Sequence, residues 1–161
     1  MRLHIFSCGG TIDKVYFDAS SQFEVGEPQI DEIFREANAG FAYKTESLMR
    51  KDSLEMTDAD RQLIRERVMA SEEPLILITH GTDTMTQTAA ALEGIPAKTI
   101  VLTGSMTPAR FRSSDAEFNI GLAVGAVQSL LPGVYIAMNG QVFRSGSVRK
   151  NMVLKRFEEI G

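Results

Sequence analysis

Residues 74–79 read "PLILIT", and "HGTDT" follows at once at 80–84. The run does not alternate apolar with polar side chains, which is typical of a strand that is buried on both faces. Three more short runs share this character and are bounded by turn residues: "LHIF" (3–6), "TIVLTG" (99–104) and "GVYIAM" (133–138). Strands of this kind are found in parallel sheets that helices cover on both sides.

Helical patterns separate these runs, over 28–39, 57–70, 84–93 and 114–131. Thr57 is the expected N-cap of the second helix, with Asp60 three residues later and an apolar stripe of Leu63, Ile64 and Val68 behind it. With a short strand near 43–48, this order predicts an α/β fold. We expect a three-layer open, mostly parallel sheet with helices on both faces, of the flavodoxin or Rossmann-like kind.

Two segments of this predicted fold stand out. Residues 12–27 fit neither a helix nor a long strand, so we expect a loop or hairpin there, mobile and lying over the site. The helix at 114–131 is apolar nearly all round, which predicts a second packing surface such as a subunit partner.

Composition limits the class of protein. The 161 residues favour one domain over 1–161, and the net charge of -4, without a block of like charge, argues against nucleic acid or an anionic membrane as the main partner. Cys8 is the only cysteine, which excludes a disulfide framework and a cysteine-rich zinc site.

The apolar stretch 121–138 is not interpreted as a membrane span, because Gln128, Ser129 and a Pro-Gly turn divide it into a helix end and a strand. The first residues do not resemble a signal peptide, and we expect a cytoplasmic protein without a metal or cofactor.

Small, hydroxyl-rich turns follow three of the predicted strands. They read "CGGT" (8–11), "HGTDT" (80–84) and "GSMTP" (104–108). In open α/β sheets the ligand crevice lies beyond the carboxyl ends of the strands, so the three turns should converge there. Glycines allow backbone N–H groups to approach a ligand, and a hydroxyl beside such donors suits acyl transfer. A lysine in a poorly solvated site is one candidate for the base that a threonine nucleophile needs.

Structural interpretations of the same residues, without a catalytic role, also stay open. Thr82 and Thr84 also suit the cap of the helix that begins there. His80 is typical of a satisfied turn residue, and the other histidine, His4, lies inside the first strand, so a histidine metal site is not expected. Cys8 is typical of a small buried residue, yet it lies close enough in sequence to be a rival nucleophile. The paired glycines suit a phosphate loop, but neither G-x-G-x-x-G nor G-x-x-x-x-G-K-[ST] occurs.

The motifs "GGTI" (9–12), "ITHGTDTM" (78–85) and "LTGSMTP" (102–108) resemble the bacterial-type L-asparaginase and glutaminase family, a class of threonine-dependent amidohydrolases. The stretches "DSLEMT" (52–57), "SSDAEFNI" (113–120) and "SVRKN" (147–151) fall in the family's order, so the resemblance spans nearly the whole chain. It implies hydrolysis of the asparagine amide through a threonine acyl-enzyme, with a homo-oligomeric assembly.

The resemblance also implies roles for individual residues. Thr11 would be the nucleophile, and Lys150 the base, with Thr82 relaying or orienting a water. Asp83 would complete that constellation and bind the α-ammonium of the substrate. The remaining roles concern substrate recognition, with Ser53 on the α-carboxylate and the backbone N–H groups of Thr11 and Ser105 on the oxyanion.

The chain departs from the family pattern in four places. By this resemblance we expect the chain to end where the family's larger domain ends and to lack the smaller C-terminal domain, which in the family supplies an acidic residue to a neighbour's site. Leu54 lines the site where many relatives have a glutamine that helps bind the ammonium. Phe23 stands in place of the usual assisting tyrosine, for which Tyr16 is a candidate substitute, and Cys8 replaces a threonine. Two alternatives to an asparaginase therefore stay open: a non-catalytic binding domain with the same fold, and a component of a larger amidotransferase.

Overall fold

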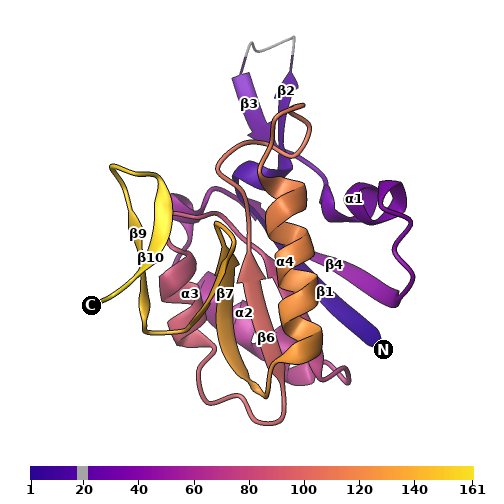
Figure 1. Cartoon of the computed structure of the whole chain (residues 1–161), viewed down its shortest axis with the longest axis vertical. Coiled ribbons are helices and arrows are strands. Elements are labelled where there is room, and N and C mark those ends of the chain that lie inside the picture. Colours follow the sequence, from indigo (N-terminus) through magenta and orange to yellow (C-terminus); the bar gives the residue numbers. More distant parts are fainter. Residues whose placement is uncertain (18–21) are drawn as a thin grey trace.

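A computed structural model describes residues 1–17 and 22–161 and shows a central sheet between helices (Figure 1). The strands are β1 (Arg2–Gly9), β2 (Lys14–Phe17), β3 (Gln22–Val25), β4 (Ala42–Lys51), β5 (Leu75–Thr79), β6 (Thr99–Thr103), β7 (Gly133–Met138), β8 (Gln141–Arg144), β9 (Val148–Asn151) and β10 (Arg156–Glu159). The helices are α1 (Ile30–Glu36), α2 (Asp58–Ala70), α3 (Met85–Ala91) and α4 (Ala116–Ser129), with 3-10 turns η1 (Thr11–Asp13) and η2 (Ser53–Glu55).

The main sheet has the strand order β4-β1-β5-β6-β7-β8. Its first five strands are parallel, and β8 pairs antiparallel with β7. The middle strands carry apolar side chains on both faces, and those of β6 are entirely buried. The predicted α/β class and mostly parallel sheet are therefore confirmed.

Each face of the sheet has its own apolar core. On one face α2 and α3 pack through Ile64, Val68 and Met85 onto side chains such as Ile78. On the other face α1 and α4 pack through Phe34 and Ile120 onto the alternate side chains of the same strands. Because successive strand residues point to opposite faces, the continuous apolar runs supply both cores.

The predicted elements agree in type and differ at their ends. Thr57 and Asp60 form the capping box of α2, as predicted, whereas Leu63 is 40% exposed and lies outside the buried stripe. Helix α1 is shorter than the predicted 28–39, and β4 is a ten-residue edge strand that is longer than the predicted 43–48. The hairpin expected within 12–27 is formed by β2 and β3, and its tip, residues 18–21, lies outside the described residues. The mobility expected for 12–27 stays a prediction.

The strands after residue 138 are absent from the sequence prediction. These are β8 and the hairpin of β9 and β10, which lies beside α3 in Figure 1. Their four-residue length leaves too little pattern for periodicity to detect.

Helix α4 behaves partly as its pattern predicts. Six of its residues face the sheet and are buried, namely Ala116, Asn119, Ile120, Ala123, Ala126 and Val127. Phe118 is 65% exposed on its outer face, and Leu122 and Val124 are half-buried. No helix in the described parts of the chain is long and apolar enough to cross a membrane.

Candidate active site

The turns after β1 and β5 touch backbone to backbone. Gly9 and Gly10 have φ angles of 84° and 91°, which lie in the region that favours glycine. A Cβ atom added to Gly10 would lie 2.4 Å from the backbone nitrogen of Gly81. The "GGT" and "HGTDT" turns are therefore packed directly together, at the carboxyl ends of neighbouring parallel strands.

The third turn, after β6, joins the same edge. A Cβ atom on Gly104 would lie 2.3 Å from the carbonyl oxygen of His80. Ser105 is 1% exposed, and its hydroxyl donates to the carbonyl of Thr107 at 2.5 Å. The carboxylate of Asp115 accepts the N–H groups of Met106 and Thr107, which fixes the loop that follows. All three predicted turns thus meet in one place.

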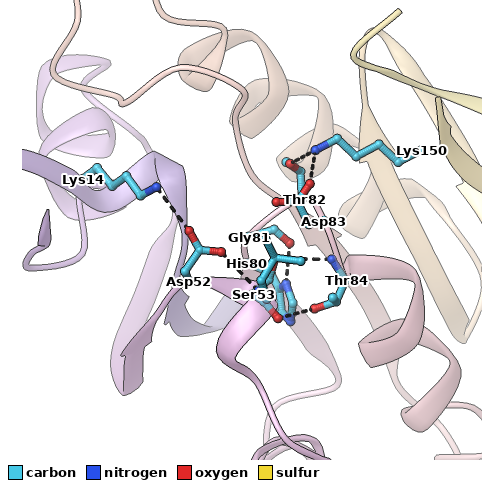
Figure 2. A network of polar contacts seen from close by, with 10 residues as sticks. Lys14, Asp52, Ser53, His80, Gly81, Thr82, Asp83, Thr84 and Lys150 are labelled. Atoms are coloured by element: carbon cyan, nitrogen blue, oxygen red, sulfur yellow. Dashed lines mark hydrogen bonds and ion pairs between the residues drawn. The ribbon is translucent and has the colours of Figure 1, made fainter. Parts of the chain in front are cut away.

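Lys150 completes a polar cluster on the "HGTDT" turn. Its Nζ lies 2.8 Å from Oγ1 of Thr82 and 2.6 Å from Oδ1 of Asp83 (Figure 2). The Lys150 side chain is only 13% exposed, and that of Asp83 is 28% exposed. Partial burial makes these charge-assisted contacts stronger than they would be in water. Lys150 is 68 positions from Thr82 and 67 positions from Asp83 in the sequence, so the fold brings distant segments together here.

The β9–β10 hairpin holds Lys150 in this position. Lys150 pairs across the hairpin with Phe157, which is fully buried, so both side chains lie on the inner face. Arg149 and Glu158 form an ion pair at 2.9 Å on the outer face. The side chain of Asn139 accepts the N–H of Phe157 at 2.8 Å, which ties the hairpin to the turn after β7.

Ser53 and Leu54 lie on η2, beside the same turn. The Ser53 hydroxyl accepts the N–H of Thr84 at 3.3 Å, and the Ser53 carbonyl accepts the Thr84 hydroxyl at 2.8 Å. The Thr84 hydroxyl is therefore not used to cap α3, although Thr84 occupies the N-cap position. Ser53 is 1% exposed, whereas the apolar Leu54 side chain is 71% exposed.

Thr11 begins η1 directly after the glycine pair and is half-buried. Its hydroxyl has no hydrogen bond within residues 1–17 and 22–161, so it is available to a ligand. Tyr16 is 53% exposed and packs against Phe23, with ring centroids 5.4 Å apart. Phe23 in turn packs against Phe111 at 5.6 Å. The structure therefore places Tyr16 in an aromatic cluster on the hairpin and not in the Lys150 cluster.

Burial makes His80 and Cys8 poor catalysts. The Nδ1–H of His80 donates to the carbonyl of Gly81 at 2.6 Å, so Nε2 accepts the Thr88 hydroxyl at 2.7 Å. Burial lowers the pKa of His80 to about 4, so its ring is neutral and structural. Burial likewise raises the pKa of the fully buried Cys8 thiol, which disfavours the reactive thiolate.

One pair in Figure 2 has no counterpart in the sequence prediction. Lys14 Nζ donates to Oδ2 of Asp52 at 3.2 Å. A lysine on a short strand and an aspartate 38 residues later carry no pattern that links them, so no sequence signal could have found the pair.

The fold and the site together define an α/β protein with a lysine, a threonine and an aspartate in contact beyond the carboxyl ends of a parallel sheet. A sequence model of a family described as "Asparaginase, N-terminal" matches residues 2–157. The chain belongs to the asparaginase family, through the N-terminal domain that defines this model.

Individual relatives agree with this assignment. The L-asparaginase of Thermococcus kodakarensis is 31% identical over 174 positions, which cover 99% of this chain and 51% of the relative, and a solved structure from that organism has a TM-score of 0.87 at 29% identity. L-asparaginase I of Vibrio cholerae has a TM-score of 0.81 at 27% identity, over 98% of this chain and 51% of the other. A glutamyl-tRNA(Gln) amidotransferase component of Aeropyrum pernix is 31% identical over 87% of this chain and 35% of the relative. The chain spans about half the length of the L-asparaginases that it matches.

Proposed function

We propose that the chain hydrolyses the side-chain amide of L-asparagine and releases ammonia and L-aspartate. The observation that carries this proposal is the contact of Lys150 with Thr82 and Asp83, on a turn that touches the turn bearing Thr11. A partly buried amine beside a hydroxyl is suited to move protons, and a hydroxyl without a partner among the described residues is suited to attack a carbonyl.

In the proposed reaction, Oγ1 of Thr11 forms a bond to the amide carbon, and the C–N bond breaks. The hydroxyl proton ends on the leaving nitrogen, which departs as ammonia and leaves an acyl ester on Thr11. Lys150 and Thr82 then orient and deprotonate a water that cleaves the ester and restores the hydroxyl. Asp83 binds the substrate's α-ammonium, and the backbone N–H groups of Thr11 and Ser105 hold the oxyanion.

The experiment is ammonia release from millimolar L-asparagine by the wild type and by Thr11→Ala. The variant should lose turnover and keep affinity for L-aspartate in calorimetry, because only the attacking atom is lost. Thr45→Ala is a matched control. Thr45 lies on the edge strand β4 and donates to Asp31 of α1, so its loss should leave turnover unchanged. Absence of ammonia release by the wild type across substrate concentration and pH would favour the non-catalytic binding domain.

A second candidate function is a component of a larger amidotransferase, in which a similar site supplies ammonia to a partner. The similarity to the Aeropyrum pernix amidotransferase component, which extends over 87% of this chain, favours this candidate. Copurification with a second protein, and ammonia release that depends on it, would support this candidate. Ammonia release by the isolated chain supports the hydrolase.

We also propose self-association and a cytoplasmic location. The exposed Phe118 on the outer face of α4, beside the half-buried Leu122, supports the first, because large apolar side chains on an outer helix face favour association. The second remains a prediction, consistent with Cys8 as a buried free thiol. Sedimentation velocity of Phe118→Asp tests the first, and cell fractionation tests the second.

A further inference from the structure

Asn119 is a buried polar side chain that the proposed reaction does not use. It lies on the inner face of α4, within the stretch "SSDAEFNI" (113–120), and is 1% exposed beside the apolar Ile120. Asparagine is a weak helix former, and a buried amide is costly unless its polar atoms are paired. The packing of α4 on the sheet therefore does not explain an asparagine at this position.

The two ends of the Asn119 amide bind two different loops at the edge of the sheet that carries the candidate site. Its Nδ2 donates to the carbonyl of Gly104 and to Oδ2 of Asp115, each at 3.0 Å. Gly104 opens the turn that bears Ser105, and Asp115 accepts two N–H groups farther along that turn. At the other end, Oδ1 of Asn119 accepts the N–H of Asn139 at 3.2 Å, in the turn after β7.

The Asn139 side chain extends this connection to the hairpin of Lys150. Asn139 and Gly140 form the two-residue turn between β7 and β8, with φ angles of 54° and 79°. Glycine suits both positions of such a turn, so the turn by itself does not require the Asn139 side chain. That side chain accepts the N–H of Phe157 at 2.8 Å, and Phe157 pairs with Lys150 across the hairpin of β9 and β10.

A chain of hydrogen bonds thus joins the turn of Ser105 to the strand that faces Lys150. We propose that Asn119 is a positioning residue, which holds the Ser105 turn and, through Asn139, the Lys150 hairpin in fixed places relative to each other. An amide that is bound at both ends cannot rotate, so it acts as a rigid spacer between the two loops.

This inference rests on the proposed amidase activity, in which the Ser105 N–H holds the oxyanion and Lys150 moves the proton. Both groups act on the transition state. Their misplacement should therefore lower kcat, whereas the ground-state affinity for substrate should change little.

Asn139→Gly cuts only the connection to the Lys150 hairpin. The variant keeps the backbone N–H that Asn119 accepts and suits the positive φ, and it removes the acceptor of the Phe157 N–H. The kcat for L-asparagine should fall by about 10- to 100-fold, the loss expected for a displacement of up to about 1 Å. The KM should stay within about threefold of the wild type.

Asn119→Leu, with a side chain of similar size, cuts both connections and should lose at least as much kcat. Thr99→Val is the matched control, measured like the others at a temperature where circular dichroism shows a folded protein. Thr99 is 4% exposed, and its hydroxyl donates to the carbonyl of Leu130, just beyond the C-terminal end of α4, at 3.3 Å. Loss of this buried hydrogen bond should lower the melting temperature and leave kcat unchanged.

Acetylation of Lys150 by an N-hydroxysuccinimide ester, followed by mass spectrometry, reports the place of its amine without turnover. In the wild type Lys150 should react slowly, because its side chain is 13% exposed and bound to Thr82 and Asp83. Asn139→Gly should raise the rate several-fold relative to the exposed Lys155, which serves as the internal reference.

Where the wild type releases ammonia, the inference requires both changes in Asn139→Gly, and the absence of either one overturns it. A lower melting temperature with unchanged kcat in Asn119→Leu would also overturn it and give Asn119 a purely structural role. Where the wild type releases no ammonia, the proposed activity fails and acetylation alone decides. Faster acetylation of Lys150 in Asn139→Gly then keeps the positioning of Lys150, and an unchanged rate rejects it.

Discussion

Replacing Gly10 with alanine should damage both the stability and the activity of the protein, through two separable effects. The φ of +91° lies in the left-handed region, where an alanine costs about 1 kcal/mol. The new Cβ would also lie 2.4 Å from the nitrogen and 2.5 Å from the Cα of Gly81. Both atoms are backbone, so no flexible side chain can move away, and the two turns must separate by about 1 Å to reach ordinary contact.

Gly94→Ala separates the two effects. Gly94 has a φ of +79° and nothing within 4 Å of its added Cβ, so it carries the backbone strain without the clash. It should lose about 1 kcal/mol, or about 2–4 °C in melting temperature for a chain of this size, with unchanged ammonia release. Gly10→Ala should melt lower still and lose about 100-fold in kcat, because a shift of about 1 Å moves Thr11 away from the "HGTDT" turn.

The assays are thermal melts followed by circular dichroism and ammonia release at saturating L-asparagine. Equal melting temperatures for Gly10→Ala and Gly94→Ala, with kcat within about threefold of the wild type, would refute the idea that backbone contact aligns the two turns.

Three further predictions concern single side chains. Lys150→Met should lower kcat by about 10²- to 10⁴-fold with little change in KM, because it removes the proton-transfer group, and an unchanged kcat would place the base elsewhere. Cys8→Ala should keep kcat within a few-fold of the wild type, because the thiol is buried and its pKa is raised. If Cys8→Ala loses turnover and Thr11→Ala does not, Cys8 is the nucleophile. His80, whose pKa burial lowers to about 4, makes the free energy of unfolding rise with pH between about pH 4 and 6.5. Burial raises the pKa of Asp13 to about 6, so its carboxyl binds a proton in the folded state that it has lost in the unfolded chain between about pH 4 and 6, and its own contribution to the free energy of unfolding falls by up to about 3 kcal/mol as pH rises through that window. Asp13→Asn should remove this fall in urea melts from pH 4 to 7, and parallel curves for variant and wild type would contradict it.

The apolar runs and the three turns could be read without a structure because both are local patterns. A strand buried on both faces needs a continuous apolar run, and a close turn needs glycine, so "PLILIT" and "CGGT" indicate their structures directly. From these two facts and the rule that ligands bind beyond the carboxyl ends of parallel strands, the edge of the sheet that carries the candidate site follows.

The identity of the groups in contact at that edge could not be read in the same way. Within the sequence, only family resemblance links Lys150 to Thr82, because the four-residue strand that carries Lys150 has no detectable period. Likewise, the sequence could not decide whether the Thr84 hydroxyl caps a helix, and the structure shows it bound to the Ser53 carbonyl instead. In both cases several local arrangements are compatible with the pattern, and a distant segment selects one of them.

The sequence alone therefore determined the class of fold, the edge of the sheet where chemistry is expected and the candidate nucleophile Thr11. Only the tertiary structure decided that Lys150 contacts Thr82 and Asp83. It also decided that Cys8 is fully buried in the core and that Lys14 donates a hydrogen bond to Asp52. The physical reason is the range of the interactions. Backbone preference and burial act through neighbouring residues and leave a periodic trace, whereas a hydrogen bond between residues 38 or 67 positions apart depends on how the whole chain packs.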